Sequence, residues 1–242
     1  MKRLIAAVLA LMMLAAFGGI FTKTVELVGA DMAMDVPTGW IVLAREQEAL
    51  EEGAGYFGMT AEEAAQFMDV NDFYMILYEP KSGAEIYVTI FGSQYAKQRG
   101  TFGAMNEEAL EKAKADVVAN YPDWVFDSEV TESSLGDFVY LACTMHLGIG
   151  EERTDNRQLY TIYNGNEIYI DLYAGDNGIE EVHVAAQDEV AASLQVDRML
   201  QRMKMAYGLC AAVMVSLMIA VLVQFVGVAM TMLLHVRMKT DK

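Results

Sequence analysis

The sequence predicts an α+β fold, in which an antiparallel β-sheet is flanked by helices and followed by a C-terminal transmembrane helix. Three observations predict it. Turn residues between stretches of alternating apolar and polar residues indicate β-hairpins. Capping residues ahead of apolar stripes indicate at least two helices, and one apolar run near the C-terminus is long enough to cross a bilayer.

The first expected elements are a short strand and a helix. The turn Pro37–Gly39 leads into an apolar strand that begins near Trp40. Thr60 and Glu63 have the spacing of a capping box, in which the hydroxyl accepts from the third amide and the carboxylate reaches back to the cap. A helix is therefore expected from Thr60 to about Val70.

A first hairpin follows this helix. Residues 72–79 and 84–91 alternate in type on either side of the turn Pro80–Gly83. Pairing across that turn sets the register of the two strands. The expected pairs on one face are Met75 with Val88 and Leu77 with Ile86.

The second half contains a helix, a strand and a second hairpin. Asn106 caps a helix with an apolar stripe, and residues 138–147 read as a strand. Residues 158–163 and 166–173 flank Asn164–Gly165, a pair favoured in type I′ turns because both positions need positive φ. The expected pairs are Leu159 with Ile170, Thr161 with Ile168 and, on the opposite face, Tyr160 with Tyr169.

The charge of the domain limits its partners. From Asp31 to Asp197 there are 32 Asp and Glu against 8 Lys and Arg, a balance of −24. Such a surface repels phosphates, so we expect no nucleic acid among the partners. A cationic ligand or loosely held divalent ions are compatible with it, and surplus acid also serves solubility.

The two ends of the chain predict export and anchoring. Residues 1–22 have the basic start and apolar centre of a signal sequence, which is either cleaved or retained as an anchor. Residues 31–203 would form an extracytoplasmic domain, 207–234 a transmembrane helix and 235–242 a cytoplasmic tail. The protein is thus expected in the cell membrane as a single-pass protein, with the lipid bilayer as a partner.

Two further expectations concern the transmembrane segment. Small or polar residues recur on one side of it, which predicts either a helix-packing face or only the composition common in such helices. These residues are Gly208, Ala212, Ser216, Ala220 and Gln224. Because no Pro or Gly interrupts the preceding segment, one nearly continuous helix is expected from about Asp188 to about Val236.

No catalytic or cofactor motif is found in the sequence. Cys143 and His146 would lie on opposite faces of a strand, which argues against a nucleophile and base pair and makes Cys143 a buried apolar residue. Two scattered histidines do not supply a zinc site, and the acidic segments lack calcium-loop spacing. We therefore expect no metal, no cofactor and no enzymatic activity.

Tyrosines predict a candidate binding surface. Six of them fall on one sheet face if both hairpins join one sheet, and tyrosine suits half-exposed binding surfaces. Cover by a helix is the alternative. The six are Tyr74, Tyr78, Tyr87, Tyr160, Tyr169 and Tyr173.

The order of these elements resembles PsbP-like domains of exported bacterial proteins. The resemblance is carried by Val36–Trp40, Met59–Glu63 and Tyr160–Asn166, within a span from about Met34 to Met203. It implies a central antiparallel sheet with flanking helices and an accessory or binding role, mostly without catalysis. No catalytic residue is carried over, and the transmembrane helix departs from the family's usual soluble or lipid-anchored members.

Three functions follow as hypotheses. The first is a membrane-anchored extracytoplasmic binding or accessory module without catalytic activity. The second is a subunit of a membrane complex, assembled with another membrane protein through the transmembrane helix. The third is a hydrolase that uses carboxylates such as Asp171.

Overall fold

An antiparallel β-sheet forms the centre of the protein, as the sequence predicts. The computed structural model describes residues 23–175 and 178–196. Within these residues eight strands join one sheet, and every pairing in it is antiparallel. In spatial order they are β3 (Ile41–Ala44), β4 (Phe73–Tyr78), β5 (Glu85–Gly92), β10 (Asn166–Tyr173), β9 (Thr154–Tyr163), β8 (Phe138–Leu147) and β6 (Val125–Phe126), with β7 (Thr131–Leu135) also paired to β8.

A separate hairpin stands before the sheet. It joins β1 (Lys23–Leu27) to β2 (Met32–Val36), and its Val25 and Leu27 are buried in the larger core. The described fold therefore starts at Lys23, ahead of the domain boundary expected at Asp31. Loss of residues 23–30 would remove β1 and expose β2.

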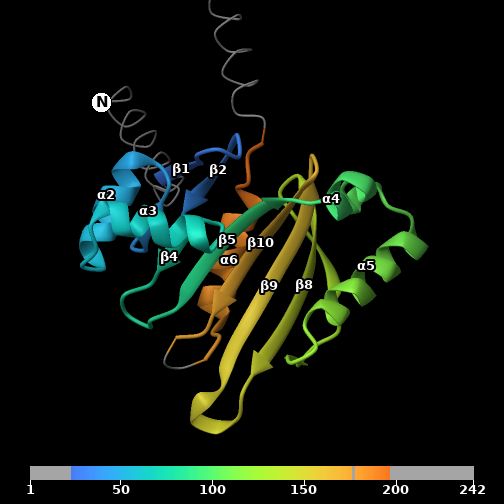
Figure 1. The fold of residues 1–242 in the computed structure, drawn as a ribbon. Helices are drawn as coiled ribbons and strands as arrows, with labels where there is room; N and C mark the ends of the chain where they lie inside the picture. Colours follow the sequence, from blue (N-terminus) through green and yellow to red (C-terminus); the bar gives the residue numbers. More distant parts are fainter. Residues whose placement is uncertain (1–22, 176–177, 197–242) are drawn as a thin grey trace, which may run out of the picture. The chain divides into compact units, whose positions relative to one another are not determined.

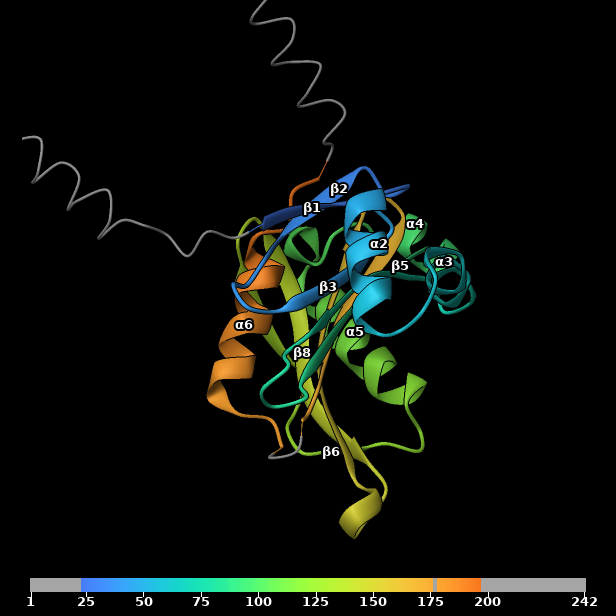
Figure 2. The ribbon, with the colours of Figure 1, turned by 90° about the vertical axis from the view of Figure 1, so that its left-hand side faces the viewer.

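Helices cover both faces of the sheet (Figure 2). α6 (Glu181–Ala192) lies on one face, where the Tyr140 hydroxyl donates to Ala191 O at 2.9 Å and Gln187 Nε2 donates to Ile170 O at 2.7 Å. α3 (Ala61–Val70), α4 (Gln94–Arg99), α5 (Glu107–Asn120) and the short turn η1 (Phe102–Ala104) pack on the other face. A second short turn, η2 (Gly150–Glu152), joins β8 to β9.

α2 (Gln47–Tyr56) lies along the edge strand β3, and the sequence did not predict it. A Cβ added to Gly53 would stand 2.3 Å from Val42 O, so only glycine permits this close approach. Glycines lower helix propensity, which is why the segment carried no helical signal. α4 was also missed, although Ser93 Oγ caps it by accepting from Ala96 N at 2.9 Å.

The local predictions based on caps and turns are confirmed. Glu63 N donates to Thr60 Oγ1 at 3.2 Å and Thr60 N donates to Glu63 Oε2 at 2.8 Å, so the capping box forms. Asn164 and Gly165 have φ of 49° and 77°, as the hairpin turn requires. The registers of both hairpins are those expected, including Met75 with Val88 and Leu159 with Ile170.

The prediction of a continuous helix from Asp188 onward is wrong. α6 ends at Ala192, where the Ser193 hydroxyl donates to Val190 O at 2.7 Å and accepts from Asp35 N at 2.8 Å. Gln195 then exchanges backbone hydrogen bonds with Ala33, at 2.8 and 2.9 Å. The chain leaves the helix because Gln195 forms its backbone hydrogen bonds with Ala33 of β2. In a continuing helix, the Gln195 amide would donate to a helix carbonyl instead.

Several sequence predictions lie outside the described residues. They are the signal sequence at 1–22, the transmembrane helix at 207–234 with its packing residues Gly208 to Gln224, and the tail at 235–242. Of the helices that the structure does describe, none has the length and apolar character needed to span a bilayer.

Candidate functional site

A strip of sheet lies between α3 on one side and α5 on the other (Figure 1). Here β5 and β10 pair so that Tyr87 stands opposite Asp171 and Glu85 opposite Tyr173. These four side chains share one face and line a groove of about 520 Å³. The complete lining is Phe67, Asn71, Phe73, Glu85, Tyr87, Thr154, Asp171, Tyr173 and Ala174.

Aromatic rings form a continuous row along this groove. The ring centroids of Phe67 and Phe73 are 5.8 Å apart, those of Phe73 and Tyr87 are 4.9 Å apart, and those of Tyr87 and Tyr173 are 5.4 Å apart. The last pair meets edge to face, at 87°. Such contacts hold the rings in fixed orientations, so the wall is preorganised.

The groove continues into a second, more apolar part of about 230 Å³. The two parts share Phe67, Glu85 and Tyr87. The second part adds Leu43, Phe57, Met59 and Ile76. The whole groove therefore runs from a polar floor beside Asp171 to an apolar end beside α2 and α3, and we call it the acidic aromatic groove.

Two carboxylates give the groove its charge. Asp171 is partly buried, and burial raises its pKa to about 6 although hydrogen bonds from Gln158 and Asn156 oppose that rise. Asp171 Oδ1 accepts from Gln158 Nε2 at 3.0 Å. Glu85 accepts from the Tyr87 hydroxyl, and burial, followed by this hydrogen bond, raises the pKa of Tyr87 well above its usual value.

Two buried amide oxygens next to Asp171 have no hydrogen-bond partner. They are Asn156 Oδ1 and Gln158 Oε1, on side chains that are 1% and 2% exposed. In the sheet, Asn156 is paired with Tyr173 and Gln158 with Asp171. The Gln158 amide cannot turn over without pointing its oxygen at Asp171, so its acceptor stays unpaired. A buried unpaired acceptor costs about 1–3 kcal/mol. Both oxygens lie behind Asp171, and neither residue belongs to the lining of the groove.

The structure separates the six candidate tyrosines. Tyr87 and Tyr173 line the groove, while Tyr78 packs against the end of α2, with its ring centroid 5.9 Å from that of Tyr56 and 5.7 Å from that of Phe57. Tyr74 does not share their face. A bulge between Phe73 and Met75 turns it toward the larger core, where the Arg45 guanidinium lies 4.2 Å from its ring centroid.

Tyr160 and Tyr169 lie beyond the groove, where Tyr160 is buried and Tyr169 is partly buried. Their rings stack at 4.5 Å, and both hydroxyls donate to Glu167 Oε2, at 3.0 and 2.8 Å. Phe102 of η1 meets Tyr160 edge to face at 5.1 Å. Helix cover, the alternative raised by the sequence, therefore applies to Tyr160.

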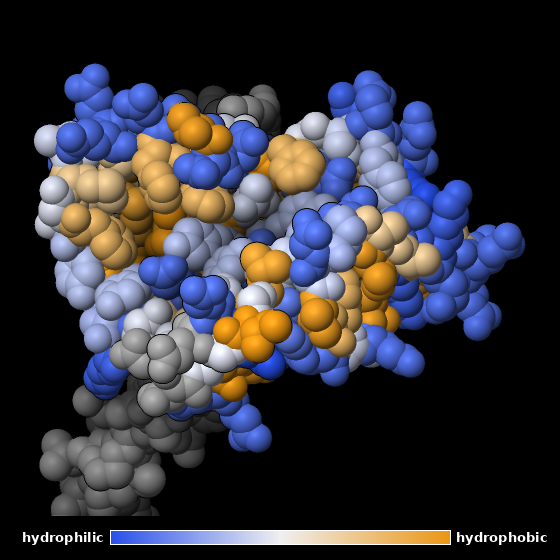
Figure 3. Space-filling model, turned by 60° about the horizontal axis from the view of Figure 1, so that its bottom comes forward, coloured by the Kyte–Doolittle hydropathy of each residue, from blue (hydrophilic) through white to orange (hydrophobic). Residues whose placement is uncertain are grey.

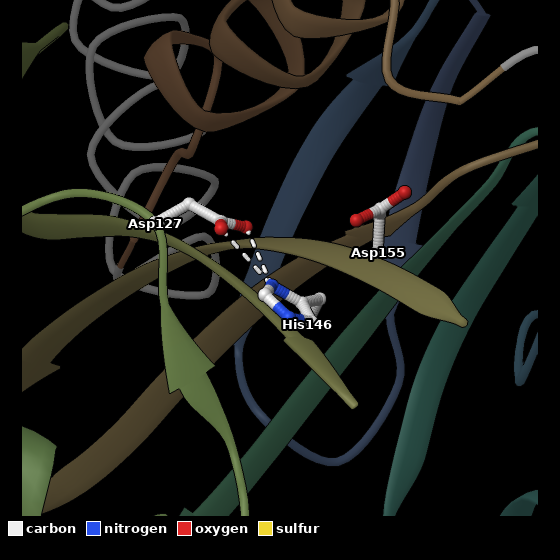
Figure 4. A group of neighbouring side chains, drawn as sticks. All are labelled: Asp127, His146 and Asp155. Atoms are coloured by element: carbon white, nitrogen blue, oxygen red, sulfur yellow. Dashed lines mark hydrogen bonds and ion pairs between the residues drawn. The ribbon is translucent and has the colours of Figure 1, made fainter. Parts of the chain in front are cut away.

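A second group of polar residues lies where β8 and β9 approach the β6 region (Figure 4). In the described part of the chain, Asp127, His146 and Asp155 form the only group of three or more His, Cys or acidic residues whose ligand atoms lie within 4.8 Å of one another. His146 Nδ1 is 3.0 Å from both Asp127 oxygens. The Arg153 guanidinium contacts Asp155 at 2.6 Å and Asp127 at 3.3 Å. Because Arg153 already supplies the positive charge, we interpret the group as an ion-pair cluster.

Cys143 is buried, as the strand pattern predicted. It is 3% exposed and packs among apolar residues under α5, and burial raises the pKa of its thiol to about 12. A thiol in such surroundings is a poor nucleophile. His146, on the same strand, faces the ion-pair cluster instead.

Sequence reasoning missed most of the groove. Glu85, Phe67 and Phe73 carried no signal, and Asp171 was named only as a hydrolase carboxylate. Alternation along the two hairpins did place Glu85 with Tyr87 and Asp171 with Tyr173. The pairing of β5 with β10, which joins the hairpins, could not be read from the sequence.

Comparisons with known proteins show similarity in fold only. No family model and no curated protein matches the sequence. Among solved structures, the cyanobacterial PsbP protein CyanoP of Synechocystis is 12% identical, with a TM-score of 0.41 over 72% of this chain and 92% of that chain. LpqN, described as involved in cell envelope biogenesis of Mycobacterium tuberculosis, is 10% identical, with a TM-score of 0.39 over 72% and 89%.

A point mutant of Mog1 is also 10% identical, with a TM-score of 0.39 over 72% of this chain and 95% of that chain. The chain spans 46% of the length of a further match from Bacteroides thetaiotaomicron. CyanoP, LpqN and Mog1 share a PsbP/Mog1-like fold. At these identities and TM-scores, the likeness extends to the coarse fold and to nothing finer.

Proposed function

We propose that this chain is a membrane-anchored extracytoplasmic binding or accessory module without catalytic activity, and that the acidic aromatic groove is its binding site. The row of four aromatic rings beside the carboxylates of Asp171 and Glu85 carries the proposal. Stacked rings offer a large rigid contact area at small entropic cost, which suits a binding site. Figure 3 shows one face of the molecule, on which hydrophobic side chains form separate groups among hydrophilic ones. A face divided in this way suits a small ligand better than a broad protein interface.

The membrane location rests on the sequence. Residues 1–22 and 207–234 supply the export signal and the anchor, and the basic tail at 235–242 suits the cytoplasmic side. The charge of −24 over residues 31–197 argues against nucleic acid as a partner. Assembly with another membrane protein through the anchor is a compatible second role.

One observation favours an enzyme instead. Asp171 has a pKa near 6 and shares the groove with Glu85, and paired carboxylates can act as acid and base in hydrolysis. The described lining contains no histidine, cysteine or lysine that could serve as a further catalytic group. Its only hydroxyls are those of Tyr87, Tyr173 and Thr154. We therefore rank the hydrolase below the binding module.

The test uses the full-length protein in nanodiscs and a panel of cationic, neutral and anionic small molecules, read by thermal shift. We expect some molecules of the panel to raise the Tm of the wild type but not the Tm of Tyr173→Ala. The control is Phe91→Ala, which removes a 38% exposed ring of the same sheet outside the groove. Hydrolysis of any ester or glycoside in the panel that stops in Asp171→Asn would replace binding with catalysis. Hits that survive Tyr173→Ala would place the site elsewhere.

A further inference from the structure

The acidic aromatic groove combines two carboxylates with a row of aromatic rings. We propose that it binds a primary ammonium group carried on a short apolar chain, as in a protonated alkylamine or arylalkylamine. The inference rests on the proposed function, because it names the ligand class of the same groove.

Charge is the first argument. Asp171 and Glu85 both line the groove, and no Lys or Arg does so among the described residues. A carboxylate that loses water without gaining a cation is costly, so the pair is incomplete as it stands. A ligand with one positive charge would supply the missing partner.

The carboxylates decide which kind of cation fits. Asp171 and Glu85 line the groove from the neighbouring strands β10 and β5. A primary ammonium has three N–H donors and can donate to a carboxylate and to a second carboxylate or a tyrosine hydroxyl together. A quaternary ammonium has no N–H, so it offers the carboxylates its charge but no hydrogen bond.

The walls argue for an organic cation rather than a metal ion. Calcium takes six to eight oxygen ligands, whereas most of this lining is aromatic or aliphatic. A cation is attracted to the face of a tyrosine or phenylalanine ring, and Tyr87 and Tyr173 flank Asp171. Beyond them, Leu43, Met59 and Ile76 line the apolar part, where the chain of the amine would be buried.

The test measures binding to the full-length protein in nanodiscs of zwitterionic lipid by isothermal titration calorimetry at pH 7.5. The probes are phenethylamine, its trimethylammonium analogue and 2-phenylethanol, which differ at the head group only. We expect phenethylamine to bind at least about 10-fold more tightly than either analogue, because a charge-assisted hydrogen bond contributes about 1.5–3 kcal/mol.

Variants locate the site. Asp171→Asn should weaken phenethylamine by about 10-fold or more, and Glu85→Gln by a smaller factor. Asp123→Asn, which removes an exposed carboxylate outside the groove, should leave the affinity unchanged.

Equal binding of the primary and quaternary amines would overturn the hydrogen-bonding argument. Absence of phenethylamine binding, or binding that survives Asp171→Asn, would overturn the ligand class. The proposed function would stand in either case if other molecules of the thermal-shift panel still required Tyr173. The proposed function would be refuted only if no molecule of the panel required Tyr173 for binding.

Discussion

Replacing Asp171 with asparagine is expected to stabilise the fold while it weakens binding. The carboxyl is partly buried, and its pKa rises from 3.8 to about 6 because burial disfavours the ionised form. Each pKa unit corresponds to about 1.4 kcal/mol, so ionisation of Asp171 costs the native state about 3 kcal/mol. Water in the open groove screens part of this, and we expect about 2 kcal/mol.

The sign of the pH dependence follows from the raised pKa. The native state holds the Asp171 proton more tightly than the unfolded state, so the stability of the wild type falls as pH rises from about 4 to about 6. Above about pH 6, the native state bears the whole free-energy cost of ionising Asp171. Burial raises the pKa values of Tyr121, Tyr173 and Cys143, so these groups near Asp171 stay neutral across this window. Gln158 and Asn156 do not ionise, and Glu85 is present in both proteins.

Urea unfolding of the full-length protein at pH 4 and pH 8 measures the effect. Trp40 and Trp124 are the only tryptophans of the chain and both lie in the described domain, so their fluorescence reports its unfolding. Asp171→Asn should equal the wild type at pH 4 and exceed it by about 2 kcal/mol at pH 8. Asp123→Asn serves as the matched control. A variant that is no more stable than the wild type at pH 8, or equally more stable at both pH values, would refute the reasoning.

Three further predictions concern packing and topology. Gly53→Ala should destabilise the domain by about 1–3 kcal/mol in urea, because the new Cβ would lie 2.3 Å from Val42 O, whereas Gly55→Ala on the same helix meets nothing within 4 Å and should be neutral or stabilising. Cys143 should resist iodoacetamide until denaturant is added, and rapid native labelling in peptide-resolved mass spectrometry would contradict its burial. Protease added to intact cells should degrade the domain but spare a tag placed after residues 235–242, and protection of the domain would contradict the expected topology.

Local chemistry explains what the sequence determined by itself. Asn164 and Gly165 fixed a turn and, with it, the register of the second hairpin, because few residue pairs tolerate positive φ. Thr60 with Glu63 and Asn106 fixed two helix starts, because their side chains satisfy nearby amides. Each of these signals acts within a few residues, so it can be read without knowing what lies across the fold.

The groove and the helix end were decided by tertiary structure. Phe67, Tyr87 and Asp171 come from segments far apart in sequence, and only the pairing of β5 with β10 and the packing of α3 bring them together. A bulge at Phe73 and Met75 moved Tyr74 to the other face, and the backbone of Ala33 drew the chain out of α6. In each case a hydrogen bond or packing contact with a distant segment outweighed a local preference worth about 1 kcal/mol or less per residue.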